Sequence, residues 1–382
     1  MYKILAISDL HVSSNDKLVD GIPLNFILIS NSIDKIISEE HPDIFIINGD
    51  IIDNVNKIDI PTISFLNMLI TSISKQCPVY INTGNHDIVE SGYTNENLSS
   101  ISNVLNIFNG IKNVIPIKQV TKLNLLDSLF LSFIPYSKNI DMLYEQINNI
   151  YVEDFGYHLI FGHTDIDFVD VEISQVKHKN LFSYNIIENK FNKYHSFWGH
   201  YHIGKQYDNH SLSLISSLSP INFGDESKIY NIEDIDKNYM HGYYVIEFEN
   251  TENVKYTFKQ NTIGKRYITL DEQHILNNNS YEYLLNYIKS NSDMYFNFRI
   301  NCNTSVIDEI QKRVSDMYIY NNIVQIQLIP LSDDISINMS NNIPDDMITK
   351  NNILDILIPE IRKIVDESEI DKYINYLKGV CI

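Results

Sequence analysis

The sequence has little of what secreted or membrane-spanning proteins use. Only three cysteines occur among its 382 residues, at positions 77, 302 and 381, and none forms a CxxC pair. Such a sparse, odd set gives neither a disulfide framework nor a thiolate metal site, so we expect a reducing, cytoplasmic environment. No apolar run is long enough to cross a bilayer, and Met1 leads directly into a strand-like segment. We therefore expect no membrane span and no secretory leader.

Positive charge is also scarce. The chain has 29 Lys+Arg against 49 Asp+Glu, which gives a formal net charge of −20. This balance argues against a protein that coats nucleic acid passively, because a basic excess supplies that kind of affinity. Residues 1–250 hold 16 basic against 31 acidic residues, whereas residues 251–382 hold 13 against 18. If the substrate is a polyanion, bound cations and a local basic patch must overcome its repulsion by the acidic chain. The alternative is that the acidic residues only form a soluble surface.

The sequence does contain many apolar runs, and their patterns alternate between strand-like and helix-like. With 44% hydrophobic residues the chain can bury a sizeable core. Strand-like and helix-like segments alternate at 3–8, 22–40, 43–50, 61–75 and 78–87. This order predicts βαβ units and a mostly parallel sheet. A helix at 94–110 and six further strands are predicted, the strands at 129–135, 157–163, 194–202, 212–220, 242–249 and 254–260. We predict an α/β fold (α+β in a mixed classification), with a two-sheet sandwich flanked by helices.

The pattern changes after Gly264. Three strand-like and two helix-like segments alternate between 265 and 332 and predict a compact β-α-β-α-β unit. Residues 333–346 are polar and predict a linker. Two amphipathic stripes predict helices within 347–379. We therefore expect four parts, namely 1–264, 265–332, 333–346 and 347–382.

Five predicted strands of the first part end in polar clusters that contain potential metal ligands. The clusters are DLH at 9–11, GD at 49–50, GNHD at 84–87, GH at 162–163 and GHYH at 199–202. Because ligands of open α/β sheets sit at the carboxyl ends of the strands, the five clusters are expected to converge on one crevice. In an extended backbone His200 and His202 point to the same side. Imidazole, carboxylate and amide without thiolate suit Mn, Fe or Zn in an open site, and seven candidate ligands suit two ions that share a carboxylate.

Each cluster alone also fits a turn or a solvated histidine. Their combination at five strand ends is what favours a metal site. Five other histidines lack such a setting and are expected to be structural or exposed: His41, His178, His195, His210 and His241.

The ordered motifs DxH, GD, GNHD, GH and GHxH resemble those of the calcineurin-like metallophosphoesterase superfamily over roughly the first two thirds of the chain. The resemblance implies two divalent ions, most often Mn²⁺, bridged by Asp50. The ligands implied for the first ion are Asp9, His11, Asp50 and His202. Those implied for the second ion are Asp50, Asn85, His163 and His200. It also implies that His86 protonates or stabilises the leaving oxygen and that Asp87 orients the His86 imidazole.

Three features resemble a particular branch of that superfamily. GDIIDN and GNHD differ from the GDxVDRG and GNHE of its protein phosphatases. The predicted unit at 265–332, the segment LSLISSLSPINFGDES (212–227) and the helices after the linker are similar to the cap and flanking segments of SbcD-like double-strand-break repair nucleases. The compact length is closest to the bacteriophage recombination endonucleases of that branch. The resemblance implies Mn²⁺-dependent 3′–5′ exonuclease activity on duplex DNA and endonuclease activity on single strands. Its setting would be DNA recombination, repair and replication, in the cytoplasm of a bacterial host if a phage encodes the chain.

The same resemblance implies three partners. The helices in 347–382 would dock on the coiled-coil base of an SMC-like ATPase, and the helices at 61–75 and 94–110 would form a homodimer. The unit at 265–332 would contact DNA, and residues 251–313 hold eight basic against seven acidic residues. Packing within the chain is the alternative for both sets of helices, and a solvated surface is the alternative for the basic residues.

Two rival functions follow from the same residues. A cyclic-nucleotide or other small phosphodiester hydrolase would use the same metals but would leave 265–382 without a role. A non-catalytic scaffold of this fold would be expected to have lost ligands or the GNHD histidine, and this chain retains all of them.

Overall fold

The computed structural model describes residues 1–331 except 90–102, 154, 170–180, 227 and 238, and Met1–Leu331 forms one compact unit. The predicted linker, the predicted C-terminal helices and most of the predicted helix at 94–110 lie outside these residues. Within the described part of that last segment, Val104–Phe108 is a 3₁₀ helix. No helix of the described ranges is long and apolar enough to span a membrane.

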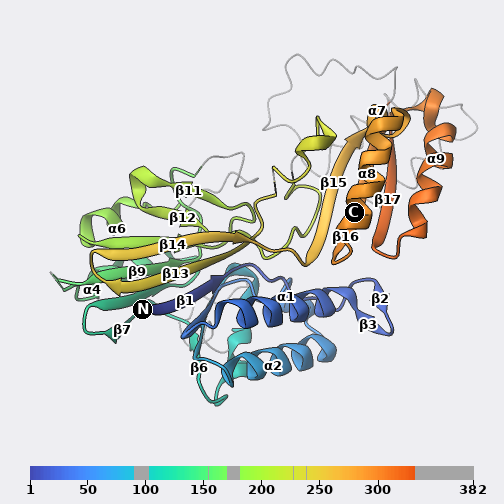
Figure 1. The fold of residues 1–382 in the computed structure, drawn as a ribbon. Coiled ribbons are helices and arrows are strands. Elements are labelled where there is room, and N and C mark those ends of the chain that lie inside the picture. The colour runs from blue at the N-terminus through green and yellow to red at the C-terminus, as the bar shows by residue number, and fades with distance from the viewer. Residues whose placement is uncertain (90–102, 154, 170–180, 227, 238, 332–382) are drawn as a thin grey trace, which may run out of the picture. The chain divides into compact units, whose positions relative to one another are not determined.

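The first sheet has six strands in the order β14-β13-β1-β4-β5-β6 (Figure 1). Their bounds are Tyr2–Ile7 (β1), Ile44–Asn48 (β4), Val79–Asn82 (β5), Val114–Ile117 (β6), Gly242–Asn250 (β13) and Asn253–Gln260 (β14). Strands β1, β4, β5 and β6 are parallel, whereas β13 and β14 add antiparallel pairs at one edge. Strand β4 is buried along its whole length, as expected for a parallel strand covered on both faces.

Two helices cover one face of this sheet. They are α1 (Leu24–Glu40) and α2 (Ile60–Ser74), and their apolar faces share a core with the sheet. Helix α2 begins where the Asp59 carboxylate accepts from the backbone N–H of Thr62 at 3.0 Å, with Pro61 in the first turn. The loops before α1 and α2 carry the first two ligand clusters, so this packing positions part of the site.

The second sheet packs on the other face of the first. Its order is β11-β12-β10-β9-β8-β7. The bounds are Thr121–Leu126 (β7), Leu129–Ile134 (β8), Tyr157–Gly162 (β9), Tyr194–Trp198 (β10), Lys205–Tyr207 (β11) and Leu212–Leu214 (β12). Side chains of both sheets form one core between them. The outer face is covered by α4 (Ile140–Asn149) and α6 (Asn185–Lys190). The layers run helix, sheet, sheet, helix, which confirms the predicted fold class.

A third sheet follows in the chain. Its parallel strands are β15 (Gly264–Asp271), β16 (Met294–Asn303) and β17 (Ile323–Leu331). Helices α7 (Glu272–Leu276), α8 (Asn278–Ser290) and α9 (Ile307–Ser315) pack on one face (Figure 1). Burial alternates along β15, so Ile268 and Leu270 join that core while Lys265 and Tyr267 lie on the helix-free face. A short hairpin of β2 (Leu18–Val19) and β3 (Ile22–Pro23) completes the sheets.

A buried arginine links β15 to the segment before it. Arg266 is 1% exposed, and its guanidinium donates to Glu226 at 2.7 Å, to Asp236 at 3.1 Å and to the Tyr287 hydroxyl at 2.6 Å. Lys265 adds an ion pair with Asp16 at 2.6 Å. A buried cation needs such full pairing, so these contacts specify how β15 packs on the preceding chain.

Two buried histidines should make the fold acid-sensitive. His158 and His195 are each 1% exposed, and burial lowers the pKa of each from 6.5 to about 4. Between pH 6.5 and 4 the unfolded chain therefore binds protons that the folded chain excludes, so stability falls as the pH falls through this range. We expect His195→Gln, whose amide can still bond the Ser213 hydroxyl, to reduce the slope of stability against pH in urea titrations. An unchanged slope between pH 6.5 and 4 would contradict this assignment.

Candidate metal centre

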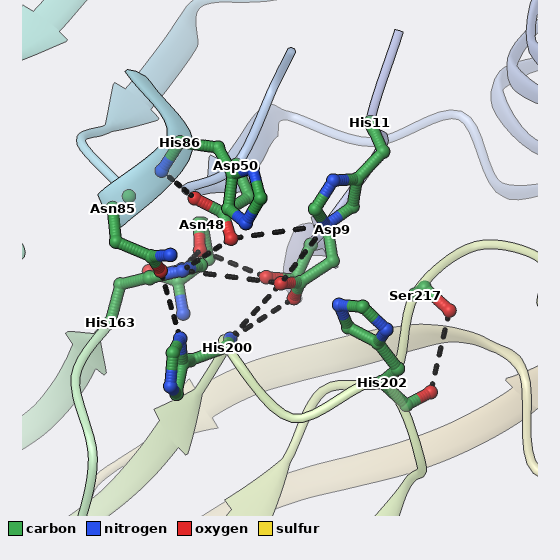
Figure 2. A network of polar contacts seen from close by, with 12 residues as sticks. Asp9, His11, Asn48, Asp50, Asn85, His86, His163, His200, His202 and Ser217 are labelled. Atoms are coloured by element: carbon green, nitrogen blue, oxygen red, sulfur yellow. Dashed lines mark hydrogen bonds and ion pairs between the residues drawn. The ribbon is translucent and has the colours of Figure 1, made fainter. Parts of the chain in front are cut away.

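All nine predicted site residues lie in segments that directly follow parallel strands, and Asn85–Asp87 forms a 3₁₀ helix there. The loops after β1, β4 and β5 come from the first sheet, and those after β9 and β10 come from the second. Because the two sheets are stacked with these ends at one edge, the loops meet. Figure 2 shows the predicted ligands and His86 gathered around Asp9 and Asp50, with the His200 ring turned toward Asn85. The convergence of five strand ends follows from topology.

Three groups of side chains in the described residues could hold a metal ion, and one of them, His11 with Asp53 and His86, includes an acid outside the predicted set. The other two consist of predicted ligands. One oxygen or nitrogen each of Asp9, His11 and His202 lie within 4.8 Å of one another, and so do those of Asp50, His163 and His200. The assignment of these side chains to two ions stays a prediction.

Asp50 lies between the two groups. Its Oδ2 is 3.2 Å from His163 Nε2 and 3.8 Å from His11 Nε2. The Asn85 side-chain oxygen contacts His200 Nδ1 at 2.8 Å. Because it lies between the two groups, the Asp50 carboxylate can contact the ligands of both.

Several buried polar atoms of the site have no hydrogen-bond partner among the described residues. They are both ring nitrogens of His11 and Nε2 of His163. Asp9 and Asp50 are each 1% exposed, and both carboxylates lie within 4 Å of His163 Nε2. Buried polar atoms are normally satisfied, and buried like charges repel. Two divalent cations would remove both costs, so the residues present fit a binuclear metal centre.

Contacts outside the predicted set fix the orientation of two imidazoles. The Nδ1–H of His163 donates to the Asn48 carbonyl at 2.6 Å, which leaves Nε2 facing the carboxylates. The Nδ1 of His202 contacts Asp225 Oδ1 at 3.1 Å, which leaves its Nε2 for the site. Such outer partners set the tautomer of metal-binding histidines. Sequence reasoning missed Asn48 and Asp225, although Asp225 lies in the 212–227 segment.

The structure gives Asp87 different partners from the predicted one. Its Oδ1 accepts from Ile51 N at 3.0 Å, and its Oδ2 accepts from Gly84 N at 2.8 Å. The His86 ring instead contacts the backbone carbonyl of Asp53 through Nδ1. Asp87 thus stabilises the turn that carries His86, while Asp53 holds the ring.

Asp53 and Asp165 are two further acids that the motifs did not mark. Asp53 Oδ1 is 3.7 Å from His11 Nδ1. Asp165 Oδ1 is 2.8 Å from His200 Nε2, so both ring nitrogens of His200 contact oxygen atoms. A metal ion at His200 would have to replace one of these contacts.

The carboxylates and imidazoles shift one another's protonation. Burial opposes charge on Asp50, but the neighbouring His163, with His11 and His86, lowers the Asp50 pKa well below its ordinary value. Burial also opposes charge on His163, yet the charges of Asp50 and Asp9 raise its pKa to about 10. Burial and the charge of Asp50 raise the pKa of Asp87 to about 7. In the metal-free chain a proton on His163 therefore supplies part of the missing positive charge.

The backbone of the site is strained at four of the predicted ligands. Asp9, His11, Asp50 and His200 have φ of 52°, 44°, 48° and 77°. Non-glycine residues adopt this left-handed region at a cost of about 1–3 kcal/mol each and concentrate at functional sites. Gly49 has φ of 90°, and a Cβ there would overlap the His163 ring. The close approach of the GD turn to His163 therefore requires glycine.

Comparison with known proteins points to the same class of site. A family model described as calcineurin-like phosphoesterase matches residues 2–242, which contain every predicted ligand. No protein with a curated description matches the sequence significantly.

Solved structures resemble the fold at low sequence identity. A purple acid phosphatase from yellow lupin seeds has a TM-score of 0.46 at 10% identity, covering 68% of this chain. This chain spans 52% of that phosphatase. A dimetal phosphatase from Danio rerio has a TM-score of 0.39 at 10% identity, covering 67% of this chain and 98% of its own. A Pseudomonas putida nuclease has a TM-score of 0.23 at 14% identity, and the match covers 41% of this chain and 59% of the nuclease.

The contact between Asp225 and His202 predicts an effect on metal affinity. Asp225→Asn keeps the size of the side chain and an acceptor oxygen but removes the charge that favours the Nδ1–H tautomer of His202. We expect Mn²⁺ affinity, measured by calorimetric titration, to fall about 10- to 100-fold. The exposed Asp208→Asn is the matched control. Wild-type affinity in Asp225→Asn would show that this carboxylate plays no part in metal binding.

Proposed function

Since the chain belongs to the calcineurin-like phosphoesterase family, we propose that the phosphoesters it hydrolyses are the phosphodiesters of DNA, with Mn²⁺ as its metal. The family makes the chain a metal-dependent phosphoesterase. The proposal of DNA as the substrate depends on the side chains near the predicted ligands.

In this proposal the two ligand groups hold two ions. Asp9, His11 and His202 would bind one, Asn85, His163 and His200 the other, and Asp50 both. When bound, two divalent ions supply Lewis-acid chemistry, because they neutralise charge on the phosphodiester and make water nucleophilic near neutral pH. The acidic chain would then accept a phosphate only in its loaded form.

His86 is suited to act on the leaving group. Its backbone N–H donates to Asp50 Oδ1 at 2.8 Å, which fixes the turn, and its Nδ1 contacts the Asp53 carbonyl. Because Nδ1 contacts that carbonyl, Nε2 is the ring nitrogen left to give a proton to the site. As water attacks phosphorus and the bond to the leaving sugar oxygen breaks, His86 would give that oxygen its proton.

One observation supports a nucleic acid substrate. Arg299 of β16 lies over the Phe223 ring at 4.2 Å, and Phe223 contacts Tyr267 of β15 edge-on at 5.2 Å. The loop of Phe223 also carries Asp225, which holds His202. Aromatic rings and arginine planes are the surfaces on which unpaired bases stack. Such a group beside a metal ligand suits a polynucleotide better than a small phosphodiester.

Digestion of DNA tests the proposal. Wild type should degrade end-labelled duplex and single-stranded DNA with Mn²⁺, and His86→Ala should bind Mn²⁺ normally but cleave about 10²- to 10⁴-fold more slowly. His210→Ala is the control, because His210 is a half-exposed histidine that bonds Glu188 instead of the metal-site residues.

Three outcomes would count against parts of this proposal. Intact DNA with wild type and Mn²⁺, even with a candidate ATPase added, would end the nuclease assignment. Loss of Mn²⁺ binding in His86→Ala would refute the proton-donor role. Efficient cleavage of cyclic AMP and bis-p-nitrophenyl phosphate without preference for DNA would favour the small-phosphodiester alternative.

We also propose that the chain forms a homodimer through α2. Two large apolar side chains of α2 are exposed, Ile60 at 78% and Met68 at 64%, and the helix carries no charged residue. Met68→Lys should weaken the dimer, as measured by light scattering, and a monomeric wild type would refute it. The proposed ATPase partner involves 347–382, outside the described residues, and is supported by the sequence resemblance alone.

A further inference from the structure

A third cluster of metal-binding side chains lies beside the two groups of predicted ligands. One ligand atom each of His11, Asp53 and His86 lie within 4.8 Å of one another, the same limit that the other two groups meet. The rings of His11 and His86 meet edge to face, with their centroids 4.8 Å apart and their planes at 76°. The proposed two-ion centre gives the Asp53 carboxylate no part. This Asp53 cluster therefore needs an explanation of its own.

The buried ring of His11 points to a cation in the Asp53 cluster. His11 is 5% exposed, and both of its ring nitrogens lack a hydrogen-bond partner among the described residues. Its Nε2 is 3.8 Å from Asp50 Oδ2, and its Nδ1 is 3.7 Å from Asp53 Oδ1. Both distances are too long for a hydrogen bond. Two ligands of one tetrahedral ion lie about 3.3–3.6 Å apart when each bond is about 2.0–2.2 Å, so the separation of Nδ1 and Oδ1 suits a shared cation.

A neutral His11 ring can serve only one metal at a time. A neutral imidazole has a lone pair on one ring nitrogen and a proton on the other. With the proton on Nδ1, the Nε2 of His11 is free to join Asp9 and His202. With the proton on Nε2, the Nδ1 of His11 is free to join Asp53 and His86. A cation in the Asp53 cluster therefore competes with the first ion of the proposed centre.

The donor atoms of the Asp53 cluster select among cations. Two imidazoles and one carboxylate are the protein ligands of open zinc sites and of non-haem iron sites. Mn²⁺ prefers oxygen ligands and stands lowest in the affinity order of the divalent first-row metals. The cluster therefore favours a cation other than the proposed Mn²⁺ cofactor.

Exposure and charge both allow a cation to enter the Asp53 cluster. The Asp53 side chain is 51% exposed, and His86 is half-buried. The Asp50 carboxylate, which accepts from the backbone N–H of His86 at 2.8 Å, adds negative charge beside the cluster. A cation can thus reach these ligands from solvent without crossing the packed core.

We propose that the Asp53 cluster is an inhibitory site for a divalent cation that prefers nitrogen ligands, such as Zn²⁺ or Fe²⁺. With the cluster filled, His11 is lost to the proposed two-ion centre. The His86 ring, the proposed proton donor, is then bound to the cation and cannot act on the leaving oxygen. The inference rests on the proposed roles of His11 and His86 but not on DNA as the substrate.

Crystals of the full chain soaked in Zn²⁺ test the position of the site. Anomalous difference maps at the zinc absorption edge should show an ion between His11 Nδ1, the Asp53 carboxylate and the His86 ring. This peak should be lost in Asp53→Asn and kept in Asp127→Asn, a matched change at an exposed acid between β7 and β8. Zinc peaks in wild type only at the predicted ligands would overturn the proposal.

Inhibition in solution gives an independent test. The assay is Mn²⁺-dependent hydrolysis of bis-p-nitrophenyl phosphate with increasing Zn²⁺, each variant being compared with its own rate without zinc. Loss of a group that only orients a metal ligand costs about 10- to 100-fold in metal affinity, so loss of a ligand should cost no less. We therefore expect the inhibitory Zn²⁺ concentration to rise at least about 10-fold in Asp53→Asn and to stay unchanged in Asp127→Asn. Added Mn²⁺ should relieve the inhibition of wild type.

Contrary results have distinct meanings. Equal or greater zinc sensitivity of Asp53→Asn would overturn the inhibitory site, because the carboxylate would then only orient His11 for the predicted centre. Inhibition that Mn²⁺ cannot relieve would refute the sharing of His11. Absence of phosphodiester hydrolysis by wild type with Mn²⁺ would instead overturn the proposed function, and the zinc position in the crystals would still decide whether the site exists.

Discussion

Buried negative charge is the constraint on which the rest of this protein depends. Asp9 and Asp50 are almost fully buried, and both face the same nitrogen of His163. Such carboxylates are stable together only when positive charge is placed between them. In the metal-free chain His163 partly supplies it, since its pKa is raised to about 10. A pair of divalent ions would supply it better and would leave positive charge for a phosphoester, so the same constraint would serve both folding and substrate binding.

The scaffold keeps these groups together through buried amides. Asn48, at the end of β4, donates to the carbonyl of Gly162 at 2.8 Å and accepts from Asn82 at 3.0 Å, so it joins the ends of both sheets. Its carbonyl also holds His163. With the ends fixed in this way, the left-handed backbone at Asp9 and Asp50 is enforced by packing on every side. Strain of this kind persists only where the surrounding structure determines it.

The acidic composition is in part a property of the site. Asp53, Asp165 and Asp225 each contact an imidazole of the centre from outside the predicted ligand set. Glu226, next to Asp225, pairs with the buried Arg266 of β15. The adjacent carboxylates of Asp225 and Glu226 therefore have different partners, the first His202, a predicted metal ligand, and the second Arg266 of the third sheet. The position of that sheet and the orientation of His202 are set by one short segment of chain.

Local patterns were enough to predict the central strands, helices α1 and α2 and the order of the ligand clusters, because strand burial and ligand spacing depend on neighbouring residues. Helices α4 and α6, which cover the second sheet, were not predicted. Strands β6 and β7 were not predicted, since their side chains are mostly half-exposed and lack a clear apolar run. Contacts between residues far apart in the sequence could not be predicted. The Asn48 carbonyl accepts a hydrogen bond from His163, 115 positions later in the sequence. The Asp87 carboxylate accepts from the backbone N–H of Ile51, after β4, instead of contacting the adjacent His86 imidazole. No spacing rule encodes such pairs. They arise when stacked sheets bring distant strand ends to one edge, and there the geometry of packing selects each partner.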